Sequence, residues 1–368
     1  MRFSFIIPAY QNRDLLLNCL EALNFQEGYG RKDYEVIVID DGSKYPLYPS
    51  IRDINKNYNF EYLYLDRDEL SSRSRARNHG LRIAKGEYIV FIDADIIVKP
   101  DYLNELNRVF RIEEEALVIG TRLMLRENTT YQEICNKSVF DKFSLTAEKP
   151  EMFDFRLPIF DELSYNSSAM KFPFIYSLTC NMAVPKSKLE LVGGFDEELI
   201  FWGIEDIELS YRLYRAGVKV IINSKLEVLH QLHGNHGSFV EEDKIEGLNK
   251  NIAVFLRKHR GVLPLLDEEV YAFFSSIATR YNMLEARQDN PLRVRLEFSR
   301  KQDLEMLKEM IEEISDREGL ELEIYDFIED TELDIWIQLL GKRKSLIKYH
   351  PMTMKSIFEK REAMYEKI

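Results

Sequence analysis

The first 120 residues alternate between short apolar runs and amphipathic helical patterns, and this alternation restricts the fold more than any other feature. The apolar runs of strand length are residues 3–7, 36–39, 88–92 and 116–119. Helical spacing separates them, first at Leu16, Leu20 and Leu23 and then over 76–83 and 103–110. Strands that alternate with helices build a mostly parallel sheet covered on both faces. The sequence therefore predicts an α/β fold with a Rossmann-like central sheet.

The helical and strand patterns return after an irregular stretch and then end near residue 260. Residues 121–175 follow no clear period, so we expect irregular or helical excursions there. Ile207, Tyr211 and Tyr214 then follow helical spacing, and further apolar patterns predict a strand over 218–222 and a helix over 245–255. We therefore predict a first domain over residues 1–260.

The remaining residues, 261–368, have the pattern of a separate small α+β module. A helix is predicted over 271–284. Alternating apolar residues then predict strands over 292–298 and 320–324, with a helical pattern over 304–314 between them. A second alternating set, Ile335, Ile337 and Leu339, predicts one more strand.

The acidic triplet Asp93-Ala94-Asp95 directly follows an apolar run. Ligands of parallel sheets collect where the strands end, and Asp41 also lies just past a strand. Two carboxylates at i and i+2 suit a divalent cation on a diphosphate, because such a cation prefers oxygen ligands and leaves positions for the phosphates. The alternative is an ordinary strand-to-loop turn that contains aspartates.

Arg73, Arg75 and Arg77 lie upstream of that triplet, and Arg73 and Arg77 would share a helix face. Guanidinium groups pair with phosphate oxygens and keep their charge. The formal net charge of the chain is −13, which argues against nucleic acid as a main partner. A diphosphate ligand would therefore need local cations such as these arginines or a metal. The alternative is a solvated basic surface.

A second acidic segment, Phe201-Trp202-Gly203-Ile204-Glu205-Asp206, begins a helical pattern. One carboxylate can accept the proton of an attacking hydroxyl, while a second binds neighbouring hydroxyls. An aromatic ring packs on the C–H face of a sugar, and glycine permits close approach of the backbone. The alternative is a plain helix N-terminus, where acidic residues are favourable by about 0.3–1 kcal/mol each. Both interpretations can hold together.

His230, His233 and His236 recur every three residues after a predicted strand. A three-histidine zinc site is conceivable. Two glycines in the same segment predict a loop, however, rather than a rigid element that carries ligands. We therefore favour a single histidine that completes an oxygen-rich site with Asp95, and His230 is nearest to the strand.

The cysteines and the N-terminal residues indicate where the protein acts. The three cysteines are odd in number and have no paired spacing, which indicates a reduced, cytoplasmic compartment. The first residues lack a signal-peptide pattern, and no run of about 18 apolar residues predicts a membrane span. We expect a soluble cytoplasmic protein, with peripheral membrane association left open.

Taken in order, these segments resemble family 2 glycosyltransferases with the GT-A fold. The likeness covers roughly residues 1–240 and leaves out both the 121–175 stretch and the module after 260. Its first segments are Phe5-Ile6-Ile7-Pro8-Ala9-Tyr10, Val38-Ile39-Asp40-Asp41-Gly42-Ser43, Ala76-Arg77-Asn78 with Gly80, and Asp93-Ala94-Asp95. Gly193-Gly194-Phe195-Asp196-Glu197, Trp202-Gly203-x-Glu205-Asp206 and His230-Gln231 are similar to segments of bacterial chondroitin-type polymerases and β-1,4-galactosyltransferases.

The resemblance implies a role for each candidate residue. Residues 1–120 would bind the nucleotide sugar, and residues 121–260 would hold the acceptor and the catalytic groups. The donor nucleotide would contact Pro8, Ala9, Tyr10, Asp41, Arg73, Arg77, Asp93, Ala94 and Gly203. Asp95 and His230 would hold a divalent cation on the diphosphate, manganese in the first place or magnesium. Asp206 would be the general base, with Trp202 and Glu205 binding the acceptor.

The implied activity is that of an inverting, metal-dependent glycosyltransferase. It would move a sugar from a UDP-sugar to a hydroxyl of a glycan or another acceptor, in bacterial glycan or polysaccharide biosynthesis. A base on the face opposite the leaving group implies inversion. The module at 261–368 would contact an acceptor, a partner protein or a second copy of the chain.

Two other functions compete with this one. A nucleotidyltransferase also uses paired aspartates on a Rossmann-like sheet, but it needs a Gly-rich basic loop that residues 8–17 lack. A catalytically silent binding module of a carbohydrate-assembly complex is the non-enzyme alternative. The joint presence of Asp41, Asp95, Glu205, Asp206 and His230 argues against lost catalysis.

Overall fold

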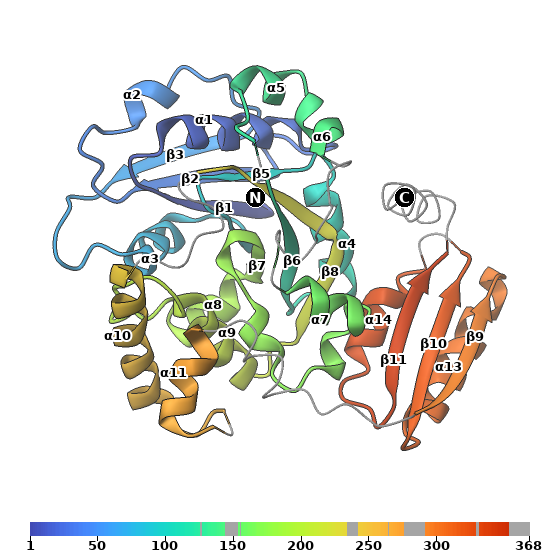
Figure 1. The fold of residues 1–368 in the computed structure, drawn as a ribbon. Helices are drawn as coiled ribbons and strands as arrows, with labels where there is room; N and C mark the ends of the chain where they lie inside the picture. The colour runs from blue at the N-terminus through green and yellow to red at the C-terminus, as the bar shows by residue number, and fades with distance from the viewer. Residues whose placement is uncertain are drawn as a thin grey trace.

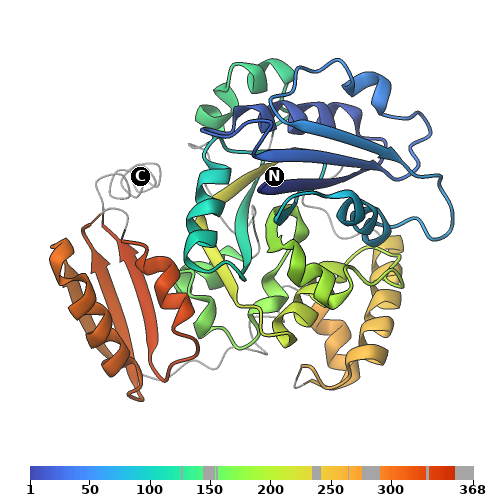
Figure 2. The ribbon, with the colours of Figure 1, turned by 180° about the vertical axis from the view of Figure 1, so that it is seen from behind.

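The computed structural model describes residues 1–125, 127–143, 154, 156–233, 242–263, 265–275, 291–328 and 331–352. Within these ranges it contains an eight-stranded sheet and a three-stranded sheet (Figures 1 and 2). None of the helices in the described ranges is long and apolar enough to cross a membrane.

The large sheet is mixed and mostly parallel, as the sequence predicts. Its strands are β1 (Phe3–Ala9), β2 (Tyr34–Asp40), β3 (Asn59–Tyr64), β4 (Tyr88–Phe91), β5 (Ile96–Val98), β6 (Leu117–Met124), β7 (Met182–Pro185) and β8 (Val220–His230), in the order β3-β2-β1-β4-β7-β6-β8-β5. β7 runs antiparallel to β4 and β6, and β5 runs antiparallel to β8. The other pairings are parallel.

Helices cover both faces of this sheet, because successive residues of its strands point to opposite sides. The helices of this part are α1 (Arg13–Ala22), α2 (Tyr48–Ile51), α3 (Arg73–Ile83), α4 (Tyr102–Ile112), α5 (Tyr131–Cys135), α6 (Ser138–Phe143), α7 (Leu157–Glu162), α8 (Lys186–Val192), α9 (Glu205–Arg215), α10 (Glu242–His259) and α11 (Asp267–Ser275). Phe5 and Ile7 of β1 pack with α1 and α4, whereas Ile6 packs in the core that α3, α8, α9 and α10 close (Figure 1). The predicted α/β architecture is therefore confirmed.

The described part of residues 121–175 is largely helical or irregular, as expected. β6 extends through Met124, and short helices follow. They are α5, α6, α7 and the 3-10 helices η3 (Ser167–Ala169) and η4 (Pro173–Tyr176), after which η5 (Thr179–Asn181) leads into β7. Short helices explain why the sequence has no sustained period there.

The C-terminal sheet is parallel and has its own core. It contains β9 (Leu292–Phe298), α13 (Leu304–Ser315), β10 (Leu320–Asp326), α14 (Leu333–Leu339) and β11 (Leu346–Pro351), with strand order β11-β10-β9. The helix predicted over 271–284 begins at Asp267 as α11, and residues 276–290 lie outside the described residues.

One predicted strand of this module is wrong. Ile335, Ile337 and Leu339 lie on helix α14, and β11 is the third strand instead. Ile335 and Leu339 pack in the core of the large sheet, whereas Ile337 packs in the core of the small one. A helix buried on two sides carries apolar residues at i, i+2 and i+4, which imitates the alternation of a strand.

Helix α14 lies on the side of the small sheet that faces the large one (Figure 1), and its side chains hydrogen-bond to α4 and β8. Arg108 on α4 donates two hydrogen bonds to the carboxylate of Asp334, at 3.1 and 2.9 Å. The buried amide of Gln338 accepts from the backbone N–H of Ile222 on β8 and donates to its carbonyl, at 2.8 and 2.9 Å. Helix α11, which begins after residue 260, packs on α10 within the core of the large sheet. The domain limit at residue 260 stays a prediction.

Candidate active site

A cavity of about 300 Å³ opens at the carboxyl ends of β1, β2 and β4. Its lining residues come from five segments and are Pro8, Ala9, Tyr10, Asn12, Asp41, Arg67, Ser71, Ser72, Arg73, Ala76, Asp93, Ala94, Asp95, Ile200, Phe201 and Trp202. Most residues predicted for the donor therefore share one cavity with Trp202. Arg77, Gly203, Glu205, Asp206 and His230 are not among the lining residues.

Asp41 lines the cavity with one carboxylate oxygen paired and one unpaired. Its Oδ2 accepts a 2.7 Å hydrogen bond from Nη1 of Arg67. Its Oδ1 is buried and has no hydrogen-bond partner. Burial raises the pKa of Asp41, while the Arg67 charge opposes that rise. The guanidinium of Arg67 also lies over the ring of Tyr10, 4.4 Å from its centroid. A buried unpaired acceptor beside an aromatic ring suits a planar ligand that carries an N–H donor.

Arg77 lies beneath the cavity, between two carboxylates. Its side chain is 1% exposed. Nη2 donates to Oδ1 of Asp93 at 3.0 Å, and Nη1 donates to Oε1 of Glu205 at 3.1 Å. Burial disfavours its charge, but Asp93 and Glu205 keep the pKa of Arg77 above the ordinary value. Its contact with the donor stays a prediction. In this structure Arg77 binds one residue of the acidic triplet and one of the second acidic segment.

Asp206 follows Glu205 in the first turn of α9. Its Oδ1 accepts from the backbone N–H of Ile207 at 2.9 Å, and Oδ2 accepts from that of Thr179 at 3.4 Å. Burial raises the pKa of Asp206 to about 7, and the adjacent Glu205 charge adds to the rise. A carboxyl group with this pKa can accept and release a proton near neutral pH.

The loop before α9 has a constrained backbone. Gly203 and Ile204 both have positive φ, +96° and +62°. Such a conformation is rare for a β-branched residue such as Ile204, and it persists only where the surroundings enforce it. Asn251 on α10 supplies part of that enforcement, since its amide donates to the carbonyls of Phe201 and Gly203 at 3.0 and 2.8 Å. Phe201 and Trp202 remain 39% and 41% exposed at the cavity.

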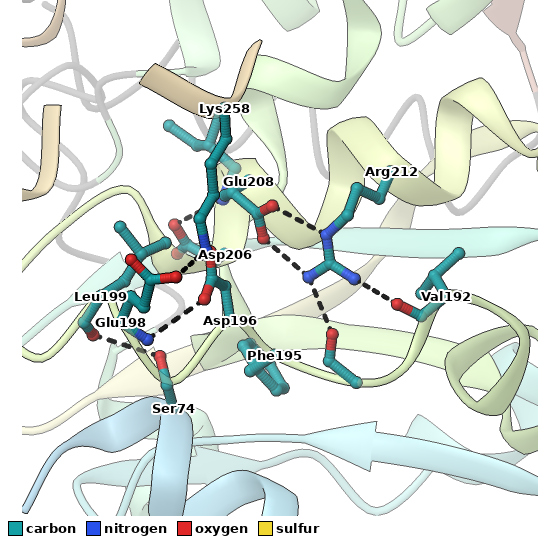
Figure 3. A network of polar contacts seen from close by, with 12 residues as sticks. Ser74, Val192, Phe195, Asp196, Glu198, Leu199, Asp206, Glu208, Arg212 and Lys258 are labelled. Carbon is teal, nitrogen blue, oxygen red and sulfur yellow. Dashed lines mark hydrogen bonds and ion pairs between the residues drawn. The ribbon is translucent and has the colours of Figure 1, made fainter. Parts of the chain in front are cut away.

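A polar network holds α9 against the segment that precedes it (Figure 3). Arg212 pairs with the buried Glu208 through two hydrogen bonds of 2.7 Å and donates to the carbonyl of Gly194 at 2.8 Å. Nζ of Lys258 on α10 donates to Asp196 at 2.6 Å. Glu208 and Arg212 both lie on α9, so their bidentate pair orients the Arg212 guanidinium toward the carbonyl of Gly194. The N-terminus of α9, with Glu205 and Asp206, is thereby held in place.

Asp95, His230 and His233 form the one group of possible metal ligands among the described residues, and one ligand atom of each lies within 4.8 Å of the others. Nε2 of His233 lies 2.7 Å from Oδ2 of Asp95, and Nε2 of His230 lies 3.7 Å from the same oxygen. β5 and β8 explain the proximity, because Ile96 pairs with His230 across them. His236 lies outside the described residues.

These three side chains fit a divalent cation. Burial opposes ionisation of Asp95, but the hydrogen bond from His233 holds the pKa of Asp95 below the ordinary value. Its Oδ1 is buried without a hydrogen-bond partner. Burial lowers the pKa of His230, which keeps its imidazole neutral, as a metal ligand must be. One carboxylate and two imidazoles are a donor set that manganese, zinc or iron accepts.

Sequence reasoning missed His233 and Arg67. His233 looked like part of a glycine-containing loop, yet its three-residue spacing from His230 was the available signal. Arg67 follows β3, a strand at the sheet edge whose partly exposed residues give a weak pattern. Among the predicted residues, Asp95 and His230 are brought together, as are Arg77, Asp93 and Glu205.

Comparison with known proteins finds two family models that match parts of this chain. Residues 4–172 match the model described as glycosyl transferase family 2. This N-terminal part of the chain is similar to glycosyltransferase family 2. Residues 162–236 match a second model, described as the N-terminal domain of galactosyltransferase, and they include Trp202, Glu205, Asp206 and His230. The two matched segments together include all residues that line the cavity, helix α9 and the possible metal ligands.

The relatives that this chain resembles include sugar transferases. It is 29% identical over 273 residues to validoxylamine A glucosyltransferase from Streptomyces hygroscopicus subsp. limoneus, covering 72% of this chain and 58% of that one. It is 30% identical over 225 residues to chondroitin synthase from Escherichia coli, covering 58% of this chain and 32% of that one. The chain therefore spans only part of the length of these relatives.

Solved structures share the GT-A fold at low sequence identity. S. aureus TarS 1–349 in complex with UDP-GlcNAc has a TM-score of 0.52 and 18% identity, covering 76% of this chain and 73% of that one. The mannosyltransferase PcManGT from Pyrobaculum calidifontis, in complex with GDP-Man and Mn²⁺, has a TM-score of 0.50 and 18% identity, covering 77% and 69%. This likeness confirms the predicted fold.

Proposed function

We propose that this chain is an inverting, metal-dependent glycosyltransferase that moves a sugar from a UDP-sugar to a hydroxyl of a glycan or another acceptor. One observation carries the proposal. A single cavity is lined by the strand ends of β1 and β2, by the acidic triplet and by Trp202. A donor bound along the strand ends and the acidic triplet would present its sugar toward Trp202. The names of the relatives, a glucosyltransferase and a chondroitin synthase, support sugar transfer.

The nucleotide half of the donor would lie against Asp41. Its unpaired Oδ1 would accept the N3–H of uracil, a donor that a carboxylate can satisfy. Tyr10, with Arg67 over its ring, would bound the base, and the backbone of Pro8 and Ala9 would line the pocket. Arg73 lines the same cavity and would face the phosphates.

Asp95, His230 and His233 would hold the divalent cation on the diphosphate. When bound, the cation neutralises charge on the departing UDP. The carboxylate of Asp93, which accepts a hydrogen bond from Arg77, would add negative charge next to the proposed cation. Manganese is the first candidate, and the specific ion is part of the proposal.

Asp206 would act as the general base. The acceptor hydroxyl gives its proton to the Asp206 carboxylate while its oxygen bonds to the anomeric carbon, and the bond from that carbon to the UDP oxygen breaks. The pKa of about 7 matches this task. Attack from the face opposite UDP inverts the anomeric centre. Trp202 would pack on the acceptor sugar beside Glu205, which Arg77 orients, while Gly203 would contact the donor nucleotide.

A screen of UDP-sugars for UDP release, with manganese and with chelator, tests the proposal. We expect release from at least one donor that requires the metal. Asp206→Asn should lower transfer by about 10²–10⁴-fold and leave UDP binding unchanged. Asp53→Asn is the matched control, because this exposed aspartate pairs with Arg52 outside the cavity. Full transfer by Asp206→Asn would contradict the base, and absence of UDP binding by calorimetry would contradict the whole proposal. Cytoplasmic action and self-association through the C-terminal module stay predictions.

A further inference from the structure

Two buried amides, Asn18 and Gln231, connect helix α1 to the possible metal ligands. Gln231 is 1% exposed and Asn18 is 4% exposed. Nδ2 of Asn18 donates to Oε1 of Gln231 at 2.7 Å and to the carbonyl of Thr129 at 3.1 Å. Nε2 of Gln231 donates to the carbonyl of Leu15 at 3.0 Å. The Gln231 side chain is therefore held at both of its polar atoms by α1.

The main chain of Gln231 contacts both Asp95 and His230. Its N–H donates to the carbonyl of Asp95 at 2.9 Å. Its own carbonyl lies 3.1 Å from Nδ1 of His230. The β5–β8 ladder ends at the pair Ile96 and His230, so Gln231 is the first residue beyond it. One further backbone bond joins Gln231 to Asp95 here, and the Gln231 side chain adds two hydrogen bonds to α1.

The contact with Nδ1 also sets which ring nitrogen of His230 is available. A carbonyl oxygen only accepts, so the neutral imidazole carries its proton on Nδ1 and donates it to Gln231. The lone pair is then on Nε2, the atom that lies 3.7 Å from Asp95. A histidine that binds a metal through one nitrogen is oriented in this way by the partner of the other.

We propose that Gln231 and Asn18 are positioning residues for the metal site. They anchor to α1 the backbone that carries Asp95 and His230, and so they set the distance and ring orientation of the two ligands. This inference rests on the proposed function, since it assumes that these ligands bind a divalent cation. According to this inference, helix α1 contributes to metal affinity although it carries no proposed ligand.

The test is the Mn²⁺ affinity of the full chain, measured by EPR of free Mn²⁺ in the presence of saturating UDP. Gln231→Leu removes both side-chain hydrogen bonds at similar volume. Gln26→Leu is the matched control, because Gln26 is also a buried glutamine that donates to a carbonyl, that of Lys99, and accepts from a backbone N–H, that of Leu103. Asn18→Ala removes only the donor to Gln231 and to Thr129.

We expect Gln231→Leu to weaken Mn²⁺ binding by about 10- to 100-fold and Asn18→Ala to weaken it in the same direction. Gln26→Leu should lose thermal stability to a similar extent and keep the wild-type Mn²⁺ affinity. Wild-type affinity in a folded Gln231→Leu protein would overturn the inference alone. If that variant does not fold, wild-type affinity in Asn18→Ala overturns it. A wild-type chain that binds UDP but no Mn²⁺ would instead overturn the metal site of the proposed function.

Discussion

The guanidinium of Arg77 lies 3.1 Å from the carboxylate of Glu205, across 128 residues of sequence, and 3.0 Å from that of Asp93. This one buried cation joins the acidic triplet after β4 to the acidic first turn of α9. It also lies over the ring of Phe195, 5.4 Å from its centroid. Since the side chain is 1% exposed, its charge is balanced by protein groups.

Removing this cation should be strongly destabilising. Arg77→Met leaves Glu205 as a buried carboxylate without its partner, which typically costs about 3–5 kcal/mol. Chemical denaturation of the purified protein measures this change. Arg82→Met, on the same helix with a more exposed ion pair to Glu197, should change the free energy of unfolding by at most about 1 kcal/mol. Equal effects of the two substitutions would contradict the buried bridge.

Transfer should depend on pH through Asp206. A general base works only when deprotonated, so kcat/KM should rise as the pH passes through about 7 and then level off. Initial rates of transfer from pH 5.5 to 8.5 at saturating manganese measure this rise of kcat/KM with pH. A rate that is flat down to pH 5.5 would mean that another group accepts the proton.

The same aspartate should reduce stability at alkaline pH. Its folded-state pKa lies above the unfolded value, so the folded protein binds more protons between about pH 4 and pH 7, and stability falls as the pH rises through that window. Asp206→Asn removes this loss, and its melting temperature should exceed that of wild type at pH 8, by about 2–4 °C for each kcal/mol gained. At pH 5 the advantage should shrink, because wild-type Asp206 is then largely protonated. Calorimetry measures the melting temperatures of both proteins at pH 5 and pH 8. The same difference between the two proteins at both pH values would contradict the raised pKa of Asp206.

His233 should contribute to metal binding although it is half exposed. His233→Ala should weaken Mn²⁺ binding by at least about 10-fold, the smallest effect typical for loss of a residue that supports a ligand. EPR of free Mn²⁺ measures it. His79→Ala, on helix α3, is the control and should keep the wild-type affinity. Unchanged affinity in His233→Ala would restrict the protein ligands to Asp95 and His230.

The C-terminal module should be needed for a stable large sheet. Gln338 pairs with both backbone groups of Ile222 on β8, at a point that β5 does not reach. Gln338→Leu leaves these buried groups unpaired, at about 1–3 kcal/mol. Deletion of residues 291–368 also uncovers the core that Ile335 closes, so we expect insoluble protein. Soluble, UDP-binding protein after this deletion would contradict that expectation.

The sequence predicted most of the large sheet because its central strands are buried on both faces. β1, β2 and β4 read as apolar runs, and their ends located Asp41 and the acidic triplet correctly. β5 has three residues and β3 is half exposed, so neither gave a pattern. α14 was predicted as a strand because its two buried faces belong to different cores.

The site was harder to predict where contacts connect distant segments. Type and spacing selected Asp95 and His230 as ligands, but no local pattern indicates that Arg77 turns inward to Glu205. Likewise, the role of Asn251 depends on the loop that it faces across the fold. Such contacts form when distant segments pack together, and no local sequence pattern predicts them.

The antiparallel pairing of β5 with β8 has a consequence for the order in which the protein matures on the ribosome. Asp95 is synthesised 135 residues before His230, and β5 has its partner only after β8 has emerged. The nascent N-terminal half can form the β1–β2–β4 sheet and the Asp41 pocket early. The proposed cation site cannot form until translation has passed residue 233. The Asp41 pocket of the proposed donor site can therefore take shape during synthesis before the proposed metal ligands are all available.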